Sequence, residues 1–158
     1  MKIKNPLRPF VITSISLYLI SLTLPAFCLG QLSCDENIGI QILAFGGLVL
    51  FSDPIGLIWL ANPILWLAWY LAWHRTNSFQ LSTLVTILML SFLLFQTAPN
   101  YMWCGGFLEQ NTCPNMSIEH LGSGYIIWLA SAIILFIGNL FNLSRQQLMT
   151  KLFFNPNN

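Results

Sequence analysis

The chain has 158 residues, of which 56% are hydrophobic and only 7% are charged. A soluble domain carries about 25% charged residues, so this composition excludes an ordinary water-exposed surface and predicts an integral membrane protein. The formal net charge of +1 supplies neither the basic field that nucleic acid needs nor an acidic tail, so no nucleic-acid partner is expected.

The first apolar run follows a basic start, as in a signal peptide. However, the run at 10–29 is long enough for a full crossing, and Phe27 stands before Cys28 where a lipid-attachment site needs a small residue. We therefore predict a transmembrane helix here.

A helix needs about 20 residues to cross roughly 30 Å of hydrocarbon. This length predicts an all-α, four-transmembrane-helix bundle in a single domain, with spans at residues 10–29, 54–73, 79–97 and 125–143. The remaining segments are expected to be outer loops at 30–37 and 98–122 and a cytoplasmic tail at 144–158.

One further apolar run, at 38–51, is too short to cross. Asp53 and Pro54 then form a helix-start signal, with Asp53 as N-cap and Pro54 at the first helical position. We predict that 38–51 is a half-helix that dips into the membrane or packs on its outer rim. The alternative is a fifth crossing.

The charged residues orient the chain. Under the four-span interpretation all six lysines and arginines fall on one side of the membrane and all five acidic residues on the other. Because positive loops stay in the cytoplasm, both termini are expected there, in the inner membrane of a Gram-negative bacterium. A five-span path would split the basic residues evenly.

Small residues recur every seven positions in two spans, which lets helix backbones approach closely. The first seam contains Ser14, Ser21 and Cys28, and the second contains Gly124, Ser131 and Gly138. The two seams can meet inside one bundle, or each can meet its copy in a neighbouring subunit. A bundle this small often gains from association, so a homo-oligomer is expected.

Asn62 and Pro63 lie near the middle of the second span. The proline removes one backbone hydrogen bond and predicts a kink, and Asn62 can satisfy the freed group. A substrate site at the kink is the alternative, because broken helices line transporter cavities.

Aromatic and basic residues mark the end of the same span. Trp69 and Trp73 belong to an interfacial belt, and His74 and Arg75 close the helix, where Arg75 would meet lipid phosphates. These four residues are predicted to anchor the helix at the membrane interface, and a bound anionic phospholipid headgroup is the sharper hypothesis for their role. After the fourth span, residues 144–154 suit a helix continuing along the cytoplasmic surface.

Under the four-span topology all four cysteines lie on the outer side of the membrane: Cys28, Cys34, Cys104 and Cys113. The outer compartment of a bacterium is oxidising, so disulfides are expected. Four cysteines allow three connectivities, and proximity in the sequence favours Cys28–Cys34 and Cys104–Cys113.

Four spans, both termini inside and a cysteine pair in each outer loop resemble the DsbB family of quinone-dependent, disulfide-generating membrane enzymes. The resemblance implies that Cys28 and Cys34 would face quinone and that Cys104 and Cys113 would face a soluble oxidase. The family's first loop carries a Cys-x-x-Cys pair, whereas five residues separate Cys28 from Cys34 here, and Asp35 and Glu36 oppose thiolate formation.

Metal binding and nucleophilic catalysis are not predicted. Cys104, Glu109, Cys113 and His120 have suitable ligand types, but oxidised surroundings compete for both thiols. We therefore expect no metal, no cofactor and no catalytic residue. The predicted role is a non-enzymatic, self-associating envelope or accessory protein that binds membrane lipid or a larger membrane complex. The alternative is the DsbB-like oxidoreductase, with quinone as its cofactor.

Overall fold

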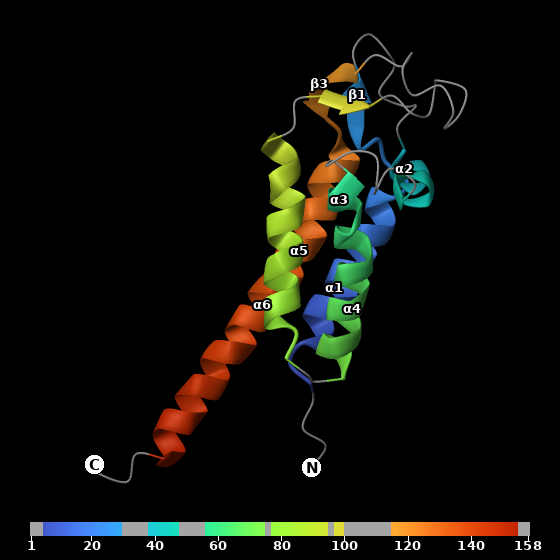
Figure 1. The fold of residues 1–158 in the computed structure, drawn as a ribbon. Helices are drawn as coiled ribbons and strands as arrows, with labels where there is room; N and C mark the ends of the chain where they lie inside the picture. The colour runs from blue at the N-terminus through green and yellow to red at the C-terminus, as the bar shows by residue number, and fades with distance from the viewer. Residues whose placement is uncertain are drawn as a thin grey trace.

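The computed structural model describes residues 5–29, 38–47, 56–74, 77–94, 97–99 and 115–154. Its helices form a bundle with a small β-sheet at one end, and the start of the first helix and the end of the last lie toward the other end (Figure 1). In chain order the elements are α1 (Arg8–Ser21), β1 (Phe27–Leu29), α2 (Gly39–Gly46), α3 (Gly56–Trp59), α4 (Ala61–Trp73), α5 (Phe79–Ser91), the 3-10 turn η3 (Phe92–Leu94), β2 (Thr97–Pro99), β3 (Asn115–Leu121) and α6 (Ser123–Phe154).

The prediction of a mostly helical chain is confirmed. The described residues are mostly helical, and two helical segments, Gly56–Trp73 and Ser123–Leu148, are long and apolar enough to cross a membrane. The prediction of four such helices is not supported by helix length, because Arg8–Ser21 and Phe79–Leu94 are shorter apolar helices.

The first predicted span, 10–29, was too long at its outer end. α1 stops at Ser21, and the chain forms strand β1 at Phe27–Leu29. Pro25 lies between them, and a proline cannot continue a helix because it lacks the N–H donor. The third span, 79–97, shortens in the same way, since helical structure ends at Leu94 and Thr97 begins β2.

A three-stranded antiparallel sheet in the order β1-β3-β2 corrects the all-α prediction. In its register Cys28 lies opposite His120, and Thr97 lies opposite Ser117. Strand β3 falls inside the predicted outer loop 98–122, so the two outer segments of the chain are joined by backbone hydrogen bonds. The sequence did not predict this sheet because β1 and β2 have only three residues each and pair with a strand distant from β1 in the chain.

The predicted half-helix at 38–51 is present as the shorter α2, within the described residues 38–47. Its start caps the end of α1: the N–H groups of Gly39 and Ile40 donate to the carbonyl oxygens of Leu24 and Leu22, at 3.0 and 2.9 Å. These bonds satisfy carbonyl groups near the end of α1. The helix-start residues Asp53 and Pro54 lie outside the described residues.

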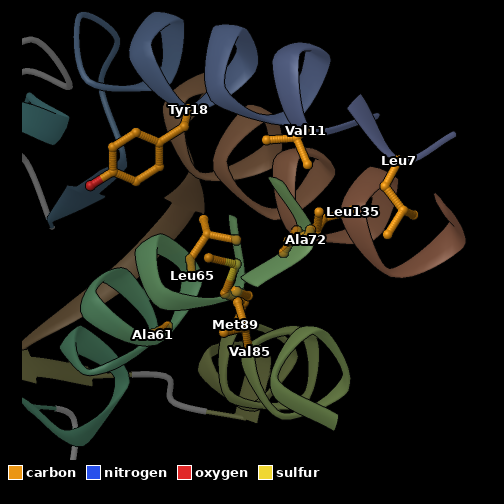
Figure 2. Close-up of a cluster of buried hydrophobic side chains, with 11 residues drawn as sticks. Leu7, Val11, Tyr18, Ala61, Leu65, Ala72, Val85, Met89 and Leu135 are labelled. Atoms are coloured by element: carbon orange, nitrogen blue, oxygen red, sulfur yellow. The ribbon is translucent and has the colours of Figure 1, made fainter. Parts of the chain in front are cut away.

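The core lies between α1, α4, α5 and α6 (Figure 2). Leu65, Met89 and Leu135 have no exposed surface and come from α4, α5 and α6. Alanines fill the closest approaches, where Ala61, Ala68 and Ala72 are also fully buried. Small and large side chains therefore interdigitate along the whole bundle, as a densely packed interior requires.

Helix α6 contains the predicted span 125–143 and continues without a break to Phe154. Its last part passes beyond the ends of the other helices (Figure 1). The tail is therefore helical to Phe154, as predicted for residues 144–154. The course of this helix along a membrane surface stays a prediction.

Candidate functional site

The interior of the bundle holds a chain of polar side chains centred on Asn62. The residue is 7% exposed, and its amide nitrogen donates to the carbonyl oxygen of Trp59 at 3.1 Å. That carbonyl would receive a helical bond from residue 63, which is proline and has no N–H. The helix is interrupted at Leu60, between α3 and α4, so the predicted kink region is irregular and Asn62 supplies the missing donor.

The side-chain oxygen of Asn62 accepts from two other helices. The Tyr18 hydroxyl of α1 donates at 3.2 Å, and the Trp128 indole N–H of α6 donates at 3.1 Å. One amide therefore connects α1, α4 and α6. Within the chain, the oxygen of Asn62 accepts two hydrogen bonds and its amide nitrogen donates one, which fits the predicted repair of the helix. The alternative of a substrate site at the kink is not tested by these contacts.

A second set of hydrogen bonds between helices lies one turn along α1 from Tyr18. The Trp69 indole N–H donates to the Ser14 hydroxyl at 2.8 Å, and that hydroxyl donates to the carbonyl oxygen of Ser131 at 2.7 Å. Both serines have no exposed surface. The ring of Tyr18 packs edge-on against Trp69, with centroids 5.2 Å apart.

The two predicted seams meet each other inside the chain. A side-chain carbon at Gly138 would lie 2.5 Å from Cγ of Phe10 on α1, and one at Gly124 would lie 2.7 Å from the carbonyl oxygen of Leu24. Ser21 is also buried, with its hydroxyl donating to Tyr18 O at 2.7 Å. Because α1 covers this face of α6, the contacts correspond to the first of the two predicted arrangements, in which the seams meet inside one bundle, and self-association stays a prediction.

Asn139 forms a separate polar junction that sequence reasoning missed. Its side-chain oxygen accepts from the Ser78 hydroxyl at 2.7 Å, and its amide nitrogen donates to the Ser82 hydroxyl at 3.3 Å. The three side chains are at most 4% exposed and join the start of α5 to α6. An asparagine within the apolar run 125–143 was the available signal, since such a residue requires a partner.

The predicted lipid residues do not form one cluster. Trp69 faces Ser14 in the interior, so it is removed from the headgroup site. Trp73 is 40% exposed, and the His74 ring lies tilted against the Tyr70 ring, with centroids 4.6 Å apart and an interplanar angle of 52°. Arg75 lies outside the described residues.

The cation that lies beside Trp73 in this structure is Arg8, a residue that the lipid prediction did not include. Its guanidinium carbon lies 4.9 Å from the centroid of the indole ring, within the range of a cation–π interaction. Asn5 ties the two segments together, because its amide nitrogen donates to the carbonyl oxygens of Ala72 and Trp73, both at 3.0 Å. Asn5 also caps the chain before α1 by accepting from Leu7 N at 3.1 Å.

At the opposite end, Cys28 is disulfide-bonded and only 6% exposed. Cys34, Cys104 and Cys113 lie outside the described residues, so the predicted pairing is not decided. Of the considered metal ligands only His120 has a described side chain, and it is exposed. The described residues contain no group of three or more metal-ligating side chains.

Comparison with known protein families, with curated proteins and with solved structures found no match to this chain. The candidate site is therefore judged on its own geometry. The polar core is made of neutral serine, asparagine, tyrosine and tryptophan side chains that bond to one another across helices. Such an arrangement holds helices in register, which is a structural role.

Proposed function

We propose that the chain is a multi-pass protein of the bacterial inner membrane, with four crossing helices and a structural or accessory role in the cell envelope. The supporting observation is the apolar exterior of the bundle. Large apolar side chains are more than half exposed on each of the four main helices, including Leu19 at 57%, Tyr70 at 61%, Ile87 at 59% and Ile126 at 58%. A surface of this kind is stable in lipid and aggregates in water.

The proposal of four crossings is supported by how the helices run together. Asn5, before α1, contacts the end of α4, and Pro25, after α1, accepts a hydrogen bond of 2.8 Å from the N–H of Gly124 at the start of α6. Segment 5–25 therefore reaches from one end of the bundle to the other. A bilayer crossed by α4 and α6 also surrounds α1 and α5, even though their helical parts are short.

The orientation rests on the separation of charges. In the sequence, the six basic residues lie in segments 1–9, 74–78 and 144–158, and the five acidic residues lie in segments 30–53 and 98–122. Because positive segments stay in the cytoplasm, we propose that both termini lie there and that the sheet lies outside.

This topology is tested with introduced cysteines and a membrane-impermeant maleimide on intact cells stripped of the outer membrane. Asn77 and His120 are both exposed. We expect the His120→Cys variant to be labelled in intact spheroplasts and the Asn77→Cys variant only after lysis. Labelling of Asn77→Cys in intact spheroplasts would overturn the orientation.

The accessory role is supported by the use of the buried polar groups. Asn62, Ser14 and Asn139 bond across helices and leave the bundle fixed, which suits a component that presents a rigid surface to lipid or to a larger membrane complex. Self-association stays part of the proposal, through a surface other than the α1–α6 seam.

The alternative function is a DsbB-like oxidoreductase that transfers electrons from thiols to quinone. The disulfide of Cys28, on a sheet that joins both outer segments, is the observation in its favour. Its burial argues for a structural disulfide, because thiol–disulfide exchange requires access to the sulfur. Replacing Cys34 or Cys104 by serine is expected to leave the oxidation of periplasmic proteins unchanged, and loss of that oxidation would establish the enzyme.

A further inference from the structure

We infer that Arg8 and Trp73 form a binding site for the phosphate group of an anionic phospholipid in the cytoplasmic leaflet. The inference rests on the proposed orientation and differs from the ligand set expected from the sequence, because it keeps only Trp73 of that set and adds Arg8 as the cation. Arg8 is exposed at the first position of α1, and Trp73 is the partly exposed last residue of α4. Two helix ends that are 65 positions apart in sequence (73 minus 8) thus bring a cation and an aromatic ring together.

The pair is held in place before any lipid arrives. Asn5 binds two carbonyl groups at the end of α4 and accepts the backbone N–H of Leu7, the neighbour of Arg8. Leu7 itself is 2% exposed and belongs to the buried core. Since both flanking segments are fixed, Arg8 does not have to be ordered when a ligand binds, which lowers the entropic cost of binding.

The chemistry of the pair suits a phosphate. A guanidinium placed over an aromatic face can still offer its in-plane N–H groups, and these match two phosphate oxygens in a bidentate geometry. The indole ring occupies the interfacial depth where headgroups lie, and it gives the acyl-chain side an apolar contact.

No aspartate or glutamate side chain of the neighbouring sequence segments is available near Arg8 to pair with its positive charge. No aspartate or glutamate occurs in residues 1–34, 54–108 or 120–158, so side-chain carboxylates are absent by sequence from every segment that leads to this end. Anionic phospholipids are the abundant negative groups at a cytoplasmic membrane face.

The test uses the full-length protein in mild detergent, titrated with phosphatidylglycerol or phosphatidylcholine and measured by native mass spectrometry. We expect preferential retention of phosphatidylglycerol. Arg8→Gln should weaken it about fivefold, because each basic residue near an anionic surface contributes an attraction of that order. Arg145→Gln, which removes the same charge from α6, should have a clearly smaller effect.

A charge-neutral pair of variants separates a site from diffuse attraction. Trp73→Leu keeps every charge and is expected to weaken retention about threefold, through loss of the cation–π contact. Trp66→Leu is the matched control, since Trp66 is 43% exposed on the same helix and its ring neighbours Tyr18, with centroids 6.4 Å apart. Arg8→Lys retains charge and should fall between wild type and Arg8→Gln.

Equal effects of Arg8→Gln and Arg145→Gln, together with equal effects of the two tryptophan variants, would overturn the site while leaving the proposed function intact. Displacement of the lipid by millimolar inorganic phosphate would show that a free phosphate is the ligand, which also overturns the lipid assignment. Labelling that places the Asn77 turn outside would overturn both the orientation and this inference.

Discussion

The side-chain amide of Asn62 donates to the carbonyl oxygen of Trp59, the backbone group that Pro63 leaves without its helical donor. The same side chain accepts from Tyr18 and Trp128, so a local repair of the helix is also the point where three helices join. The proline and the asparagine that precedes it therefore act as one unit.

This coupling predicts a non-additive pair of variants. Asn62→Ala removes one acceptor and one donor from the buried network, and we expect a loss of about 2 kcal/mol in the free energy of unfolding. In a Pro63→Ala background, the new N–H at position 63 can reach Trp59 O, so the same substitution should cost about 1 kcal/mol less. Thermal unfolding in mild detergent measures all four proteins of the cycle.

Gln80→Ala provides the control for that cycle, because Gln80 is an exposed polar residue on α5. We expect its unfolding temperature to match the wild type in both backgrounds. Equal costs of Asn62→Ala with and without Pro63 would contradict the role of Asn62 as the substitute donor.

The seam between α1 and α6 gives a second prediction, based on contacts at two glycines. Alanine at Gly138 gains about 1 kcal/mol of helix propensity but forces its methyl group against the Phe10 ring, which costs roughly 1–3 kcal/mol. Gly138→Ala should therefore be destabilising alone and less destabilising in a Phe10→Ala background, where the ring is gone but Cβ of residue 10 still lies 2.7 Å from the new methyl group. Thermal unfolding again provides the measurement.

Gly124→Ala is the matched comparison, because its methyl group would meet the backbone oxygen of Leu24, which a side-chain change cannot remove. It should be destabilising with or without Phe10. None of these substitutions should change the subunit number determined by native mass. A loss of oligomers in Gly138→Ala at unchanged stability would return the seam to an intersubunit role.

Asn139 gives a third prediction, at the start of α5. Asn139→Ala leaves the buried Ser78 hydroxyl without its acceptor, and we expect a loss of about 1–2 kcal/mol. Asn142→Ala is the control on the same helix, because Asn142 is only partly buried. Similar unfolding temperatures for the two variants would show that the junction does not stabilise the contact between α5 and α6.

The features that the sequence predicted correctly are those set by residues close together in the chain. Apolar runs located α4 and α6, because helix length and hydropathy are local properties. The hydrogen bond from Asn62 to Trp59 could be anticipated for the same reason, because Pro63 lacks the N–H that would otherwise donate to the carbonyl oxygen of Trp59. The ends of α1 and α5 were placed too far outward, because hydropathy continues past Pro25 and past Leu94, where strands begin.

The contacts that define the candidate site could not be predicted from the sequence. Trp69 lies on the same span as Trp73, and periodicity placed both in one belt, yet Trp69 bonds Ser14 in the interior. The meeting of Arg8 and Trp73 depends on Asn5, a residue whose neighbours lie 67 and 68 positions away. Long-range pairs of this kind leave no periodic signal in a single sequence.

The disulfide of Cys28 gives a fourth prediction. Pro25 and Ile38 form an antiparallel bridge, which brings together the two ends of the segment that contains Cys28 and Cys34. This closure favours Cys34 as the partner of Cys28. Non-reducing digestion and mass spectrometry should therefore find both cysteines within one linked segment, and a link from Cys28 to Cys104 or Cys113 would contradict the pairing.

A disulfide across so short a loop contributes about 2 kcal/mol to the free energy of unfolding. The double variant Cys28→Ser/Cys34→Ser should therefore lose about that amount while remaining folded. Collapse of the fold in that variant would show that the Cys28 disulfide holds more of the outer end than its own loop.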